Sequence, residues 1–170
     1  MKILSKEKNV LIRKLIGLGS AILCLLLMFF KFINYTSMSE VTNSSSIVWD
    51  DGMSLFSFLF SNKTEVLSIP VSRLREIFVY SNVIMWISFV LVCISIVILS
   101  GGIFLKKNII SKVGSLVLVS AIVLLFTISF DRYSIGNTVA YLDIFTVWFW
   151  FMAIISAIGL YSTSTLKDSK

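Results

Sequence analysis

Long apolar stretches alternate with short groups of charged residues along this chain. The longest stretch, residues 77–105, holds 29 consecutive residues without an Asp, Glu, Lys, Arg or His. A helix needs only about 20 apolar residues to cross the ~30 Å of hydrocarbon in a bilayer, and a charge at that depth is costly. The pattern therefore predicts a transmembrane helix over residues 82–105.

Three further stretches follow the same pattern. Residues 15–30 carry no charge, and the flanking basic side chains can extend their heads to the interface, which predicts a span over residues 11–33. Residues 113–130 and 144–165 provide the other two spans. We expect an all-α integral membrane protein, a four-transmembrane-helix bundle that forms a single domain over residues 1–170.

The first span also resembles a signal peptide, because a basic N-terminal region precedes its apolar stretch. Bulky residues fill the exit from this stretch, and Ser37-Met38-Ser39 is a poor small-residue cleavage motif. Leu23 before Cys24 argues against a lipoprotein. The sequence favours a retained anchor over a cleaved signal.

The segment between the first two spans, residues 34–81, is predicted to form a large loop. Within it, the apolar residues 53–60 are too few to cross a membrane, so we expect a short interfacial helix or a segment packed on the mouths of the spans. A second short amphipathic helix is predicted to begin near Pro70. Shorter connections are expected at residues 106–112 and 131–143.

Basic residues are unevenly distributed between the two sides of the predicted bundle. Residues 1–14, the 106–112 connection and the C-terminal tail hold ten of the fifteen Lys and Arg residues, whereas the other side holds seven of the nine acids. The positive-inside rule therefore predicts that both termini are cytoplasmic (N-in, C-in) and that the large first loop is extracellular.

Composition agrees with a membrane protein. The chain is 57% hydrophobic and 14% charged, whereas soluble domains have about 25% charged residues. The net charge of +6 is explained by the cytoplasmic lysines, so we expect the lipid bilayer and no nucleic acid as a partner. Composition rich in Ile, Ser, Lys and Asn favours a low-GC bacterium as the source, and hence the plasma membrane.

The residue types exclude several chemistries. The interiors of the predicted spans lack Asp, Glu, Lys, Arg and His, from which proton relays and ion pathways are built, and the whole chain has no histidine. Asp50-Asp51 is more simply a solvated turn than a cation site, because calcium needs about six to eight oxygen ligands. Cys24 and Cys93 lie within spans and are not placed for an extracellular disulfide. We expect no enzymatic activity, no metal ion and no cofactor.

Small and basic residues suggest how the helices assemble. Small residues at helical spacing allow close helix packing; this set comprises Gly17, Ala21, Gly114, Ala153 and Ala157. Basic residues near the cytoplasmic face set the orientation and can contact anionic lipid head groups, at ~1 kcal/mol each; they are Arg13, Lys14, Lys106, Lys107 and Lys112. Packing within one bundle is favoured, and a homo-oligomer stays open.

Four spans with a large first outer loop resemble the topology of claudin-type tetraspan proteins. The first loop of those proteins carries tryptophans followed by a cysteine pair. Here Trp49 stands alone and the loop has no cysteine. The resemblance is therefore one of topology, and it assigns no family.

These observations favour a non-enzymatic plasma-membrane protein that acts by contact, as an accessory, assembly or immunity-type partner of a larger membrane or envelope system. Aromatic residues of the outer face are the predicted contact residues: Trp49, Phe56, Phe58, Phe60, Trp148 and Trp150. The alternative is a small channel or permease subunit that acts as an oligomer, which predicts a stripe of Ser and Thr along a common axis.

Overall fold

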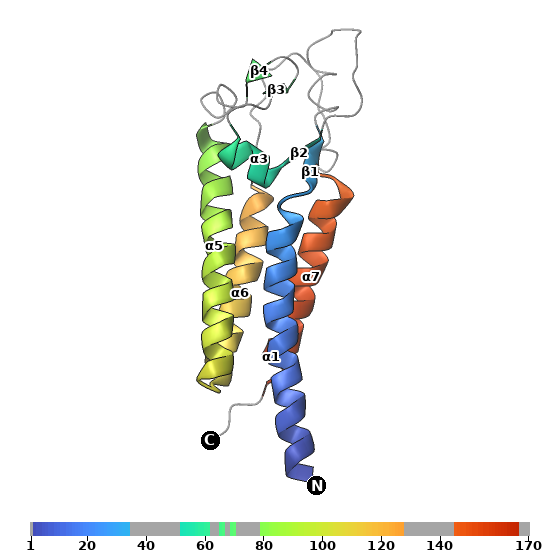
Figure 1. Ribbon diagram of the computed structural model, residues 1–170, viewed down its shortest axis with the longest axis vertical. Helices are drawn as coiled ribbons and strands as arrows, with labels where there is room; N and C mark the ends of the chain where they lie inside the picture. The colour runs from blue at the N-terminus through green and yellow to red at the C-terminus, as the bar shows by residue number, and fades with distance from the viewer. Residues whose placement is uncertain are drawn as a thin grey trace.

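The computed structural model describes residues 2–34, 52–61, 65–66, 69–70, 79–127 and 145–166. Within these ranges, four long helices lie side by side (Figure 1): α1 (Lys2–Leu27), α5 (Val79–Phe104), α6 (Asn108–Leu125) and α7 (Val147–Ser164). Each contains at least 18 residues that are apolar enough to cross a membrane. The prediction of four helices that are long and apolar enough to span a membrane is therefore confirmed.

The helices differ from the predicted spans at their ends. Helix α1 stops at Leu27 rather than at residue 33, because residues Lys31–Asn34 form strand β1 and pair with strand β2 (Gly52–Ser54). Helix α6 starts at Asn108, five residues earlier than predicted. The connection before it is short enough that Lys106 adopts a positive φ of 54°.

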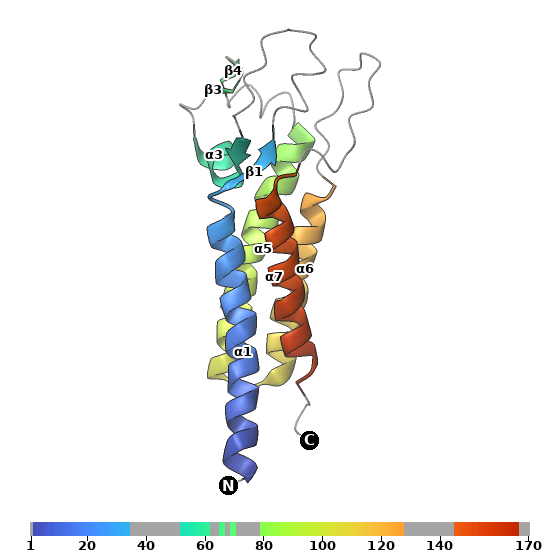
Figure 2. The same cartoon turned by 90° about the vertical axis from the view of Figure 1, so that its right-hand side faces the viewer.

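The four helices form a ring in which α1 packs between α5 and α7, and α6 completes the other side (Figures 1 and 2). Helices α1 and α6 begin at the same end of the bundle, where α5 and α7 end. We call this the terminal end, and we call the opposite end the cap end. Large buried side chains fill the axis between the helices: Phe149, Met28, Met85, Leu99, Leu118, Ile122 and Leu125.

Small residues lie where the helices cross. A Cβ atom on Gly17 would lie 2.8 Å from Thr163 Cγ2, and one on Gly114 would lie 2.8 Å from Leu99 Cγ. Ala21 is fully buried. These three predicted packing residues therefore occupy contacts between helices.

The two alanines of α7 differ from the expected pattern. Ala153 is half-buried against the core, but Ala157 is exposed and takes no part in packing within the bundle. Instead, Gly159 provides the close approach of α7 to α1, since a Cβ there would lie 2.8 Å from Ser20 Cβ. The helix turns so that Gly159, rather than Ala157, faces α1.

A small cap closes the other end of the bundle. The β1–β2 ladder leads into helix α3 (Leu55–Phe60), whose N-terminus is capped by the Ser54 hydroxyl accepting from the Ser57 amide at 3.0 Å. Leu55, Phe58 and Leu59 are buried in the mouth of the bundle. Of the two placements that the sequence allowed for this segment, the structure has the one packed on the spans.

Two further strands, β3 (Glu65–Val66) and β4 (Ile69–Pro70), pair as a second antiparallel ladder (Figure 1). Pro70 therefore lies in a strand rather than at the start of a helix. Residues 71–78, over which the predicted amphipathic helix extends, lie outside the described residues.

The contact between α5 and α6 gives a prediction about Gly102. Its α-carbon faces α6 so closely that a Cβ would lie 2.8 Å from the Ser111 backbone nitrogen, whereas a Cβ on Gly101 would meet nothing within 4 Å. Gly102→Ala should destabilise the protein by about 2 kcal/mol through overpacking. Gly101→Ala should be neutral or stabilise it by up to about 1 kcal/mol, because alanine favours helix. Thermal unfolding in detergent measures both, and equal midpoints would contradict the packing.

Candidate functional site

Two adjacent basic residues of α1 reach the ends of both neighbouring helices. Helices α5 and α7 have no basic residue in their own last turns, and the last carbonyls of any helix lack intrahelical partners. Arg13 and Lys14 donate hydrogen bonds to those ends. We call the two residues and their acceptors, Gly102 and Thr165, the basic clamp.

Lys14 binds the end of α5. Its Nζ donates to the Gly102 carbonyl at 3.0 Å, and the residue is only 3% exposed. The Gly102 carbonyl is free to accept, because the Lys106 amide, its ordinary partner, donates to Ile103 instead at 3.2 Å. A cation at this position also meets the negative end of the helix dipole. Lys14 is therefore a C-terminal cap that α1 supplies to α5.

Arg13 binds the end of α7 in a corresponding way. Its Nη1 donates to the Thr165 hydroxyl at 2.6 Å and approaches the Thr165 carbonyl at 3.3 Å. Thr165 is the C-terminal cap residue of α7. Unlike Lys14, Arg13 is exposed. Together the two residues tie α1 to both of its neighbours at the terminal end.

The clamp corrects part of the predicted lipid-facing set. Lys14 was expected to extend toward the interface, but its side chain turns inward and is not available to a lipid head group. Arg13 is exposed and keeps donors that Thr165 does not use. Lys106 and Lys107 are exposed in the α5–α6 connection, and Lys112 is half-buried.

The sequence places Lys14 among the lipid-facing residues because it follows Arg13 at the end of the basic N-terminal segment. Its spacing nevertheless contains the signal, since Lys14 lies three residues before Gly17 on the face that continues through the buried Ala21, Cys24 and Met28. Alternating steps of three and four place such residues on one side of a helix. That stripe faces the bundle interior, so its first member is buried.

Hydroxyl groups line much of the interior, as the transport alternative predicted. Most of them bond to helix carbonyls: Ser88 donates to Ala121 at 2.6 Å across the α5–α6 contact, and Thr163 donates to Gly159 at 3.1 Å. Ser111 and Ser115 of α6 differ, because their buried Oγ atoms have no hydrogen-bond partner among the described residues. Both lie near the terminal end, close to the basic clamp.

Aromatic rings form a ladder at the cap end. Phe29 stacks on Phe56 with centroids 4.3 Å apart, Phe56 lies 4.6 Å from Phe60, and Phe60 meets Trp86 edge-on at 5.0 Å. Phe60 is 44% exposed and Trp86 37%. We call these four rings the aromatic ladder. It joins the turn after α1 to α3 and α5 and leaves part of each ring accessible.

The predicted contact residues separate into different environments. Phe56 and Phe60 belong to the aromatic ladder, whereas Phe58 is fully buried beneath it and is corrected from a contact residue to a core residue. Trp148 stacks on Phe30 at 4.8 Å, and Trp150 packs on Phe126 at 5.7 Å. Trp49 lies outside the described residues.

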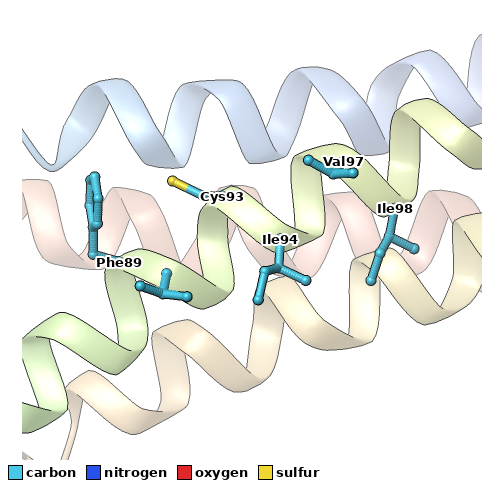
Figure 3. Close-up of a pocket in the computed structure, with 6 residues that line it drawn as sticks. Phe89, Cys93, Ile94, Val97 and Ile98 are labelled. Atoms are coloured by element: carbon cyan, nitrogen blue, oxygen red, sulfur yellow. The ribbon is translucent and has the colours of Figure 1, made fainter.

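A shallow apolar groove of about 350 Å³ runs along α5 below the ladder (Figure 3). Its walls carry only apolar groups: Phe89, Val90, Cys93, Ile94, Val97 and Ile98. Both cysteines are free; Cys93 lines this groove, whereas Cys24 is buried with its Sγ 3.6 Å from the Met152 carbonyl. The groove is a surface that lipid chains can fill.

Within the described ranges, no group of three or more His, Cys, Asp or Glu side chains is placed to hold a metal ion. Asp50 and Asp51 lie outside those ranges. Comparison of the chain with protein-family models, with curated proteins and with solved structures finds no match.

The basic clamp predicts that reversing the charge at Lys14 is far more harmful than reversing an exposed charge. In Lys14→Glu, a buried carboxylate would face the Gly102 carbonyl and the negative end of α5, which should cost roughly 3 kcal/mol. Lys8→Glu makes the same charge change on the exposed part of α1 and should cost no more than about 0.5 kcal/mol. Thermal unfolding of the purified variants measures the difference. Similar midpoints would show that Lys14 is not buried in the membrane protein.

Proposed function

We propose that the chain is a non-enzymatic, multi-pass protein of the plasma membrane that acts by contact with another protein. Its role is that of an accessory, assembly or immunity-type partner of a larger membrane or envelope system. The observation that carries this proposal is the aromatic ladder, whose rings pack against one another at one end of the bundle and remain partly exposed.

The packing of α3 against the bundle supports a contact role. Leu55, Phe58 and Leu59 anchor α3 in the bundle, and the Phe56 amide donates to the Met28 carbonyl at 3.1 Å. The exposed edges of Phe60 and Trp86 are therefore preorganised, so little entropy is lost when a partner covers them. Aromatic residues in such positions contribute strongly to protein contacts.

The proposed orientation has both termini in the cytoplasm and the cap end outside. The distribution of basic residues supports this orientation. The basic segment 1–14 and the lysines of the α5–α6 connection both belong to the terminal end, and basic residues are enriched on the cytoplasmic side of membrane proteins. Trp86, Trp148 and Trp150 lie toward the opposite end, where they suit a membrane interface.

The proposal also retains the first helix in the mature protein. Ala21 and Cys24 of α1, and Met28 directly after it, are fully buried against the other helices, and Lys14 caps α5. Removal of α1 as a signal peptide would expose this interior and leave the end of α5 without its cap.

The channel or permease alternative receives less support. Its predicted Ser and Thr stripe is present, but most of these hydroxyls bond to helix carbonyls and large side chains such as Phe149, Met152 and Leu118 fill the same axis. Hydroxyl groups that already donate hydrogen bonds to helix carbonyls, among large side chains that fill the axis, do not line a water-filled path.

A double variant of the aromatic ladder tests the contact role. Phe60→Ala with Trp86→Ala removes two of its three exposed rings, Phe29 being the third, and should lower partner recovery from cross-linked native membranes about 30-fold, as expected for a 2 kcal/mol contact. The matched control is Phe104→Ala, which removes an 85% exposed ring from the terminal end of the same helix and should leave recovery unchanged. Equal recovery from both would indicate that the ladder contacts lipid only.

The orientation predicts the behaviour of reporter fusions. Alkaline phosphatase, which is active only outside the cytoplasm, should be inactive when fused after residue 170 and active when inserted after residue 61, just beyond α3. Green fluorescent protein fused to either terminus should fluoresce. A phosphatase active at residue 170 would reverse the proposed topology.

A further inference from the structure

Lys14 is a buried cation for which the described residues provide no countercharge. It lies within an apolar span at 3% exposure, and no described carboxylate forms an ion pair with it. An unpaired charge in such surroundings is costly, and ionisable residues at membrane depth usually mark functional sites. The helix end that Lys14 caps supplies only a partial negative charge.

The ammonium also has unused hydrogen-bonding capacity. A lysine Nζ carries three donors, and the Gly102 carbonyl occupies one of them. The remaining donors lie inside the bundle, because Lys14 is buried between α1 and the last turn of α5. A ligand for these donors must therefore be an acceptor that enters the bundle.

Two buried side chains beside Gly102 and Gly17 have no hydrogen-bond partner among the described residues, and both are hydroxyls, which can donate a hydrogen bond. Ser111 contacts the same residue as Lys14, since its backbone nitrogen would lie 2.8 Å from a Cβ on Gly102. Its Oγ is buried and has no partner among the described residues. Ser111 and the Lys14 ammonium therefore both lie beside Gly102.

Ser115 extends this arrangement by one turn. Helices α1 and α6 run in the same direction, and Gly17, about one turn after Lys14, faces Ser115, about one turn after Ser111. The Ser115 Oγ would be 3.4 Å from a Cβ on Gly17, and it too is buried and unpartnered among the described residues. One ammonium and two hydroxyls thus gather at the crossing of α1, α5 and α6.

We infer that this crossing binds a single monatomic anion of the halide class. The ammonium only donates and each unpartnered hydroxyl can donate as well, so together they suit a ligand that accepts hydrogen bonds, and a monovalent anion neutralises the lysine charge. The burial of all three side chains excludes a bulky phosphate head group. The negative partial charge at the end of α5 neutralises part of the Lys14 charge, and the anion neutralises the rest.

Thermal unfolding of the full chain in nanodiscs of zwitterionic lipid tests this inference. Replacing gluconate by chloride or bromide at constant ionic strength should raise the unfolding midpoint, by about 5 °C at a hundredfold excess over the dissociation constant. Line broadening of the chloride NMR signal provides a second readout that does not depend on stability. Both effects should disappear in Ser111→Ala with Ser115→Ala, a double variant that breaks no hydrogen bond found among the described residues.

Two further variants make the result decisive. Lys14→Met keeps the shape of the side chain but removes the charge, and it should also abolish the halide effects. Ser88→Ala removes a buried hydroxyl bonded to Ala121 and should retain them.

Three outcomes would overturn the inference. In the first, the wild-type protein shows no halide effect, which would leave ordinary buried water as the partner of the two hydroxyls. In the second, a halide effect survives in Lys14→Met. In the third, anionic phospholipid reproduces and competes with the halide effect, which would assign the lysine to a lipid head group.

Discussion

Lipid cannot satisfy a backbone carbonyl, and this constraint explains the terminal end of the bundle. Two helices, α5 and α7, end beside α1 without basic residues of their own in the last turn. Consecutive residues of α1 supply the missing donors: Lys14 to Gly102 and Arg13 to Thr165. Because successive residues on a helix point about 100° apart, one dipeptide can reach two neighbouring helices. The clamp therefore satisfies the backbone and fixes the position of α1 at the same time.

The cap end meets the same constraint by different means. There the chain leaves α1 and pairs β1 with β2, the Thr146 hydroxyl before α7 donates to the Lys31 carbonyl at 2.7 Å, and α3 inserts its apolar face into the mouth. Strand pairing and side-chain caps provide hydrogen-bond partners for backbone groups that an open loop would leave without partners. The two ends thus differ in chemistry, with cationic caps at one and an aromatic and hydroxyl cap at the other.

Hydropathy predicted the four helices because burial in lipid depends on composition over about 20 residues and not on any partner. The spacing of small residues predicted close packing at Gly17 and Gly114, where small side chains are the only local requirement. Neither pattern predicted the clamp, because Gly102 and Thr165 act through carbonyls, which every residue possesses. The sequence also did not show that Phe58 is buried and Phe60 exposed. The two residues face opposite sides of one short helix, and which side is buried depends on how α3 docks on the bundle.

The burial of Lys14 also bears on how the bundle selects one arrangement. Apolar helices in lipid have few directional contacts, so neighbouring registers differ little in energy. A shift of α1 by one turn toward the cap end would move the ammonium from the Gly102 carbonyl to the level of Leu99 and the other large apolar side chains of the core. An unpaired charge among apolar groups costs several kcal/mol, which is more than any single van der Waals contact between the helices contributes. A lysine that adds little net stability can therefore determine the register of the first helix, and through it the position of the aromatic ladder at the opposite end.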